Sequence, residues 1–375
     1  MKPHQRIFFT QFAVAVCLAA LLARLPDIQI DFGLSEGQLG LLLLCLSAGV
    51  LSGLTFSVPV IERLGARTSA YLSVFGTSIL LAFVPSMPSA SLAAVLLFGS
   101  GLFLGMFEVN SNIETDRHEA VLGYRIMSRA HGLWSVGFFL SALAAAGFRH
   151  FAVSVELHMA IVVLSILSVA AVIFSRIENA PLRAYSQVGI QPLIALPTLA
   201  MLPLCLIGAA PLFAEGASVD WSAIYMRDVF AVAPFTGGLA PAIFSFSIAA
   251  GRLLMDPVVD RYNSQNVAVT LLAVTAAGLV IVATAAHEYV ALAGFGLIGI
   301  GCSSVYPLAI SAAAQRTDRP GAINVAALSQ TTFVVFFLGP PLLGFAAEHF
   351  GVRTSYWLVV PVVLSAMLVT KTLSR

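Results

Sequence analysis

The residues most able to do chemistry in this sequence are acids and imidazoles inside long apolar stretches. Glu108 follows Gly101 and Gly105 and precedes Asn112, and the spacings of four, three and four place all four on one helix face. Glycines let a neighbouring helix approach closely, and burial favours the neutral form of a carboxyl. Glu108 is therefore a candidate proton-coupling residue. The alternative is a structural acid hydrogen-bonded to a neighbouring helix.

His131 and Trp134 lie one helical turn apart in the next apolar stretch. Imidazole titrates near neutral pH, which makes His131 the second proton-coupling candidate. The indole of Trp134 can stack on a solute ring. Either side chain can equally be a packing residue.

Further candidates lie in the second half of the chain. Glu215, Asp220 and Trp221 follow Pro203 and Pro211, and we expect them where an apolar stretch meets the outside. Proline kinks helices, and broken helices flank transport sites. A solvated loop with an interfacial Trp is the alternative. The candidate solute-binding residues are Asn112, Trp134, Glu215, Trp221, Tyr306 and Gln330.

A third group of charged residues lies at the ends of apolar stretches. Charge pairs there can hold one side closed and so bias a conformational equilibrium. Arg24 can pair with Glu215 or another acid, or extend to lipid headgroups. The others can simply anchor the chain in the membrane. The candidate gating residues are Arg24, Glu62, Arg63, Arg67, Asp260 and Arg261.

The composition indicates which structural elements must position these residues. The 375 residues are 59% hydrophobic and 10% charged, whereas soluble domains carry about 25% charged residues. The apolar stretches are near 20 residues, the length of a membrane-spanning helix. We expect twelve of them, at 7–26, 37–60, 68–87, 91–113, 126–147, 152–175, 193–215, 234–255, 267–286, 289–314, 325–346 and 355–373.

The sequence thus predicts an all-α, multi-pass membrane protein in two six-helix halves. The halves are residues 1–175 and 193–375, joined by a cytoplasmic linker at 176–192. With both termini cytoplasmic, the basic residues fall at cytoplasmic ends, as the positive-inside rule expects. The exceptions are Arg24, Arg149, Arg227 and Arg353.

Two short segments suggest an internal repeat. Residues 62–69 read ERLGARTS and residues 348–355 read EHFGVRTS. The predicted topology places them on opposite sides of the membrane, as inverted three-helix repeats require. Coincidence between two polar loops is the alternative.

Other functional classes lack their motifs. The net charge is +1, and the sequence contains no cluster of basic residues that could bind nucleic acid. The sequence contains no phosphate-binding loop, catalytic triad order or metal-ligand spacing, so we expect no enzyme, cofactor or metal. The expected partners are a small-molecule solute, protons and membrane lipid.

The segment Glu62–Arg67 after the second stretch, and its counterpart Asp256–Tyr262, carry a family resemblance. Together with the six-plus-six pattern they resemble the major facilitator superfamily, whose signature there is Gly-x-x-x-Asp-Arg-x-Gly-Arg-Arg/Lys. This sequence has Glu62 in place of the Asp and Val58 in place of the first Gly. The resemblance implies the twelve-helix fold of secondary transporters, working as monomers.

Other motifs resemble one branch of that family. The spacing of Glu108 and Asn112, the pair Glu215 and Trp221, and Tyr306 before a proline are similar to fucose-permease-type sugar transporters. The AEG and DW residues within 214–221 and the GPPLLG stretch at 339–344 resemble YbjJ-like and MosC-like proteins. This implies a sugar- or cyclitol-like solute and a proton-coupling role for Glu108, in the cell inner membrane.

Two other functions remain open on the sequence. The first is an exporter of amphipathic or toxic compounds, with an aromatic-lined cavity. The second belongs to another class, a membrane receptor or assembly factor that has lost transport. Such a protein would not need a titratable acid at position 108.

Overall fold

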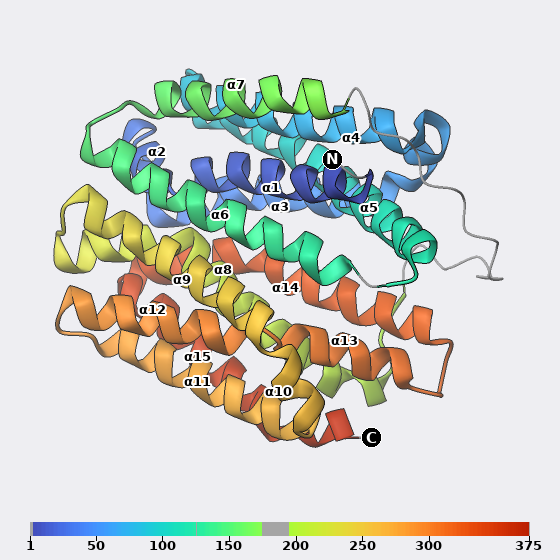
Figure 1. The fold of residues 1–375 in the computed structure, drawn as a ribbon. Coiled ribbons are helices and arrows are strands. Elements are labelled where there is room, and N and C mark those ends of the chain that lie inside the picture. The colour runs from blue at the N-terminus through green and yellow to red at the C-terminus, as the bar shows by residue number, and fades with distance from the viewer. Residues whose placement is uncertain (1–2, 125, 175–194, 375) are drawn as a thin grey trace. The chain divides into compact units, whose positions relative to one another are not determined.

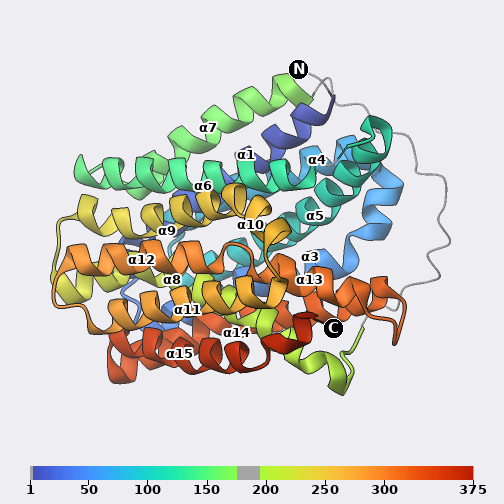
Figure 2. The ribbon, with the colours of Figure 1, turned by 60° about the horizontal axis from the view of Figure 1, so that its bottom comes forward.

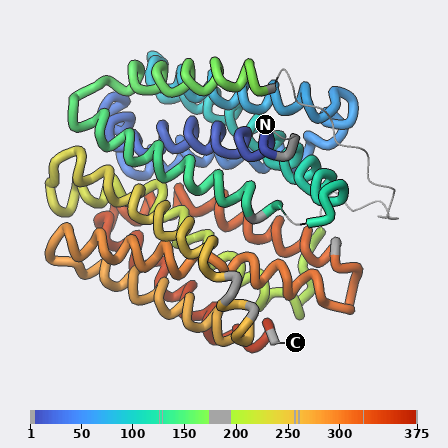
Figure 3. The backbone as a smooth tube through the Cα atoms, in the orientation of Figure 1, coloured from blue at the N-terminus to red at the C-terminus, as the bar shows by residue number. Residues whose placement is uncertain are grey.

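The structure is a computed structural model that describes residues 3–124, 126–174 and 195–374. The chain divides into two compact units, Met1–Leu34 with Leu41–Gly189, and Ser35–Gly40 with Ile190–Arg375. The predicted linker 176–192 lies outside the described residues. The division at that linker therefore stays a prediction. The trace in Figure 3 lets the helices of each unit be followed from end to end.

In the first unit, α1 packs against α6, α7 and α4, and α4 packs against α5 and α7 (Figure 1). The serine before α5 caps it, because the Ser89 side chain accepts a hydrogen bond from the Leu92 amide. The helices are α1 Pro3–Leu22, α2 Leu25–Asp31, α3 Glu36–Phe56, α4 Val58–Phe83, α5 Ala90–Leu122, α6 Met127–His150 and α7 Val155–Phe174. The 3₁₀ helix η1, Val84–Ser86, follows α4.

In the second unit, α8 packs against α9, α14 and α15, and α11 packs against α12 and α15. Figure 2 shows α10 as a short helix beyond α9. The helices are α8 Leu202–Phe230, α9 Pro234–Leu254, α10 Asp256–Arg261, α11 Ser264–Thr284, α12 Glu288–Cys302, α13 Val305–Gln315, α14 Gly321–Phe350 and α15 Val352–Leu368. The 3₁₀ helices are η2, Leu199–Met201, and η3, Thr370–Ser374.

Within the described residues, eleven helical segments are long and apolar enough to cross a membrane. One of them, Glu288–Gln315, consists of α12 and α13, which are separated at Ser303 and Ser304. The predicted twelfth span falls on α15, a shorter apolar helix of 17 residues. The protein is thus an all-helical, multi-pass membrane protein. The count of twelve spans and the cytoplasmic side of the termini stay predictions.

The boundaries of three predicted spans are wrong: 68–87 is Val58–Ser86, 91–113 is Ala90–Leu122, and the largest difference is in the seventh span. The stretch expected at 193–215 is a helical segment at Leu199–Phe230. We ended it at Glu215 because charged residues lower hydropathy. The helix continues because the residues after Glu215 are mostly buried, including Trp221 and Tyr225 at 0% exposure.

The charged segment after α3 is also different from the predicted loop. The chain stays helical from Val58 and breaks only at Gly65, where φ is 76° and ψ is 160°. Only glycine adopts this backbone region easily. Asn110 of α5 donates from Nδ2 to the Ala66 carbonyl at 3.1 Å, which ties the segment after the break to α5.

The glycines of α5 allow α3 to pack closely, as their spacing predicts. A Cβ added to Gly101 would lie 2.9 Å from the Gly49 Cα, and one added to Gly105 would lie 2.8 Å from the Gly53 Cα. Real Cβ atoms do not come this close. The two helices can therefore approach to this distance only because both facing positions are glycine. This contact fixes the face of α5 that carries Glu108.

Candidate functional site

Glu108 lies deep within α5. At 1.5 Å per residue it is about 27 Å from the start of this helix and about 21 Å from its end. The helix is thus about 50 Å long, longer than the ~30 Å hydrocarbon core, and Glu108 lies in the middle part of this helix. The side chain is half-buried, and Asn112 donates from Nδ2 to Glu108 Oε1 at 3.0 Å.

Trp134 of α6 contacts the residue that precedes this acid. Its ring stacks on Phe107, with ring centroids 6.1 Å apart and planes 21° apart. The sequence candidates Glu108 and Asn112 therefore come together on α5, whereas Trp134 contacts Phe107, which is rotated about 100° from Glu108 around this helix. His131 is half-buried on the same helix as Trp134. No hydrogen bond or ion pair joins its side chain to Glu108, and the structure describes both residues.

A second acid lies at mid-helix depth in α8. Glu215 is about 20 Å from the start of this helix and about 22 Å from its end. It faces Arg252 of α9, with Glu215 Oε2 and Arg252 Nη2 3.6 Å apart. Their side chains are 26% and 32% exposed. The expectation that Glu215 lies at the outer end of its span is therefore wrong.

Arg24 pairs with an acid other than Glu215, which is one of the alternatives that the sequence left open. Its Nε lies 2.5 Å from Asp27 Oδ2, and its Nη2 donates to the Val153 carbonyl at 2.8 Å. Arg149 reaches the same carboxylate at 3.1 Å. Two of the four predicted outer bases thus share one acid within the first unit. The Arg24–Glu215 pairing is replaced by Arg24–Asp27 and Glu215–Arg252.

Trp221, a predicted solute-binding residue, is completely buried in the second unit. A Cβ on Gly344 of α14 would lie 2.9 Å from its ring, so the indole packs against that helix. Asp220 is only partly exposed in the same helix. In this structure Trp221 therefore serves packing.

Tyr306 and Gln330 make contacts within the second unit. The Tyr306 hydroxyl lies 3.3 Å from the Ser329 hydroxyl, which links α13 to α14. Gln330 Oε1 accepts a hydrogen bond from the Ala195 amide at 2.8 Å. Tyr306 lies in the first turn of α13, directly after the break that separates it from α12.

The gating candidates of the first unit lie around the Gly65 break. Glu62, Arg63 and Arg67 are exposed, and the Arg67 guanidinium lies 6.0 Å from the Tyr71 ring centroid. In the second unit, Arg261 ends α10 and its guanidinium lies 5.8 Å from the Tyr262 ring. The side chain of Asp260 lies outside the described residues. The gating role of all these residues stays a prediction.

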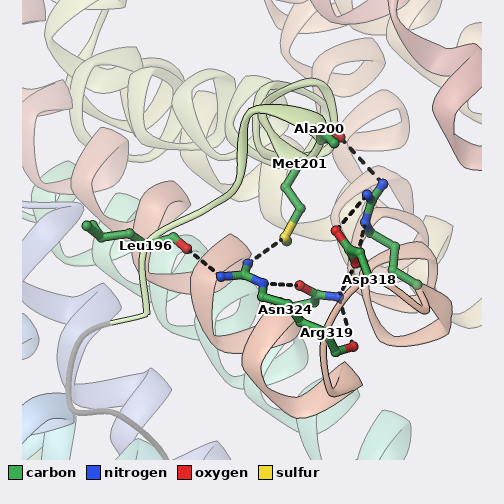
Figure 4. A network of polar contacts seen from close by, with 7 residues as sticks. Leu196, Ala200, Met201, Asp318, Arg319 and Asn324 are labelled. Atoms are coloured by element: carbon green, nitrogen blue, oxygen red, sulfur yellow. Dashed lines mark hydrogen bonds and ion pairs between the residues drawn. The ribbon is translucent and has the colours of Figure 1, made fainter.

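The sequence reasoning missed a polar network at the start of α8 (Figure 4). Asp318 lies between α13 and α14, accepting from Arg316 Nη2 at 2.8 Å and from Asn324 Nδ2 at 3.0 Å. The bond from Arg316 is the main reason why the pKa of Asp318 is lowered to about 2. Asp318 is solvent-exposed and lies outside the spanning helices.

Arg319 extends this network to the segment before α8. Its guanidinium donates to the Asn324 side chain at 3.1 Å, the Leu196 carbonyl at 3.0 Å and the Met201 sulfur at 3.1 Å. The only indication of this network in the sequence is the polar stretch RTDRP at 316–320, which is typical of a loop. The contacts with residues 196 and 201 depend on the fold.

Comparisons with known proteins match this architecture. The family model of the Major Facilitator Superfamily matches residues 204–374. An uncharacterized MFS-type transporter of Yersinia pestis is 26% identical over 97% of this chain and 94% of its own length. The membrane protein MosC of Rhizobium meliloti is 24% identical over 95% of this chain and 86% of its own.

Solved structures agree on the fold. The nucleoside transporter NupG has a TM-score of 0.74 at 13% identity, with both chains fully covered. A bacterial homologue of the lysosomal transporter Spinster has a TM-score of 0.68 at 15% identity, covering 100% of this chain and 98% of its own. The solved structures share the helical fold of a multi-pass membrane protein. The similarity to the Major Facilitator Superfamily model covers residues 204–374, slightly less than half of the chain.

Proposed function

We propose that this protein moves a small polar solute across the membrane by alternating access, coupled to protons at Glu108. The observation that carries the proposal is the place of Glu108. This acid lies in the middle part of α5, a helix long and apolar enough to span a membrane, and the partner of its carboxylate is the neutral amide of Asn112. Ionisable residues at such depth are costly and mark solute and proton pathways.

The contrast with Glu215 supports this choice of proton site. Glu215 faces the permanently charged guanidinium of Arg252 and forms an ion pair with it. Glu108 has no such cation among its described contacts, so it can exchange a proton without leaving a cation uncompensated. His131 remains a second proposed proton-coupling residue, supported by its position one turn from Trp134.

The proposed solute contacts come from both units, each considered by itself. In the first unit they are Asn112 and Trp134, whose amide and ring suit a hydroxylated ring compound. In the second unit they are Glu215, Tyr306 and Gln330. A sugar- or cyclitol-like solute follows from the resemblance to fucose-permease-type transporters.

The orientation and location are also part of the proposal. We place the protein in the cell inner membrane with both termini cytoplasmic, because this assignment puts most basic residues on the cytoplasmic side. This orientation places five of the proposed gating residues at the cytoplasmic side, where charge pairs can hold that side closed: Glu62, Arg63, Arg67, Asp260 and Arg261. We propose that the protein works as a monomer.

Solute uptake by purified protein in liposomes tests the proposal. The panel contains radiolabelled sugars, cyclitols and nucleosides together with amphipathic amines. We expect saturable uptake of a hydroxylated ring compound that Trp134→Ala weakens and Glu288→Gln leaves unchanged, since Glu288 lies in the first turn of α12, outside the site. Saturable uptake of the amines alone would contradict the solute class and favour an exporter. No saturable uptake of any compound would contradict transport.

A further inference from the structure

A small cavity with several polar side chains in its lining lies inside the first unit, among α1, α4 and α5. It has about 30 Å³ open to the centres of water molecules. A single water needs about 10–15 Å³ by this measure, so the cavity has room for about two. Its polar lining consists of Arg6, Thr10, Asn110, Ser111, Glu114 and His118.

Two atoms on the lining residues need a partner that the protein does not supply. Asn110 is 3% exposed, and its Nδ2 donates to the Ala66 carbonyl. Because a carbonyl only accepts, this bond fixes the amide orientation and leaves Oδ1 as an acceptor. Among the described residues no donor reaches Asn110 Oδ1, and no acceptor reaches the buried Arg6 Nη1.

The neighbouring residue Gln11 repeats the pattern. It is completely buried, its Nε2 donates to the Ser111 hydroxyl at 2.9 Å, and its Oε1 accepts from no described residue. Ser111 itself lines the cavity. A buried polar atom without a partner destabilises the folded state, so a donor and an acceptor of this kind on the lining of one cavity indicate a ligand that both donates and accepts.

We propose that this cavity is a structural hydration site that holds one or two ordered water molecules. The water accepts a hydrogen bond from Arg6 Nη1 and donates one to Asn110 Oδ1. A small anion would satisfy Arg6 and leave the amide oxygen unpaired. A metal cation would satisfy the oxygen and be repelled by the guanidinium. Water satisfies both groups.

The site is separate from Glu108, the proposed proton site. At about 100° per residue, Asn110 is rotated about 200° and Glu114 about 240° from Glu108 around α5. These two residues thus lie on the side of α5 away from Glu108, toward α1 and α4. The hydration site is therefore independent of the proposed transport function.

The water completes a connection to the backbone break in α4. Arg6 of α1 binds the water, the water binds Asn110 of α5, and Asn110 binds the Ala66 carbonyl directly after Gly65. Ala66 and Ala70 also line the cavity. The site thus joins α1 and α5 to the point where α4 resumes, and its function is to hold these three helices in register.

Hydroxyl-radical footprinting by X-ray radiolysis tests the site in the full protein in detergent, because radicals formed from a bound water modify the side chains beside it. Phe107 lines the cavity and is 1% exposed, whereas Phe295 is 0% exposed and is not among its lining residues. We expect modification of Phe107 and none of Phe295. The variants are Ala70→Leu, which fills the cavity, and Arg6→Met, which removes the donor.

Each variant should lose the Phe107 modification while keeping a monodisperse elution profile. A high-resolution electron cryomicroscopy map of the wild type gives a readout that needs no variant, namely density within hydrogen-bond distance of Arg6 Nη1 and Asn110 Oδ1. The proposal is overturned if Phe107 is as unmodified as Phe295, if Ala70→Leu leaves its modification unchanged, or if that density is absent from a map that shows ordered water elsewhere.

Discussion

Gly65 and Gly351 have almost the same backbone conformation, although they lie in different units. Gly65 has φ 76° and ψ 160°, and Gly351 has φ 82° and ψ 151°. They occupy the same position in ERLGARTS and EHFGVRTS. Four residues further on, Ser69 and Ser355 are both 0% exposed. The two segments therefore share a local structure as well as residue types, which supports an internal repeat over coincidence.

Replacing either glycine by alanine should destabilise the protein. Both lie in a backbone region that is open almost only to glycine, where another residue costs about 1–3 kcal/mol. We expect Gly65→Ala and Gly351→Ala each to lower the free energy of unfolding by about that amount, measured by thermal unfolding in detergent. The control is Gly147→Ala, because a Cβ there meets nothing within 4 Å. Equal melting temperatures for all three variants would contradict the account.

The Glu215–Arg252 pair should behave as a coupled unit. Either Glu215→Gln or Arg252→Gln removes one charge of this ion pair and leaves the other, whereas the double variant removes both. We expect the double variant to be more stable than the sum of the single losses predicts, by about 0.5–3 kcal/mol. The measurement is a double-mutant cycle of thermal unfolding in lipid nanodiscs. Additive losses would show that the two residues act independently.

The network at Asp318 should weaken in acid. Its pKa is lowered from 3.8 to about 2, so its contacts stabilise the folded state fully above pH 3.8 and lose that effect as the pH falls toward 2. The melting temperature of wild type should exceed that of Asp318→Asn by a constant amount near neutral pH. That difference should shrink below pH 3.8. A difference that stays constant through this range would contradict the assigned contacts.

The sequence predicted the helices better than it predicted the contacts between them. Long apolar runs identified the helices because each must satisfy its backbone inside the bilayer. The run that we ended at 215 was wrong because hydropathy falls at Glu215 and Asp220, whereas burial of Trp221 and Tyr225 keeps the helix intact.

Contacts between helices were harder to predict. The α5 glycine stripe correctly predicted a close helix contact, but not that α3 makes it. Arg252 lies on a different helix from Glu215, and Arg149 lies far along the chain from Asp27. Such pairs depend on helix rotation and depth, which hydropathy does not give. Asn112 lies one turn from Glu108, so local spacing was enough to find that pair.

The most direct test of the account is proton movement driven by the solute that the uptake panel identifies. Wild type, Glu108→Gln and the distant control Glu288→Gln would be placed in liposomes with an internal pH dye. The account predicts that adding the solute moves protons with wild type and with Glu288→Gln, and that Glu108→Gln abolishes this movement. Solute-driven proton movement that persists in Glu108→Gln would contradict the role of Glu108.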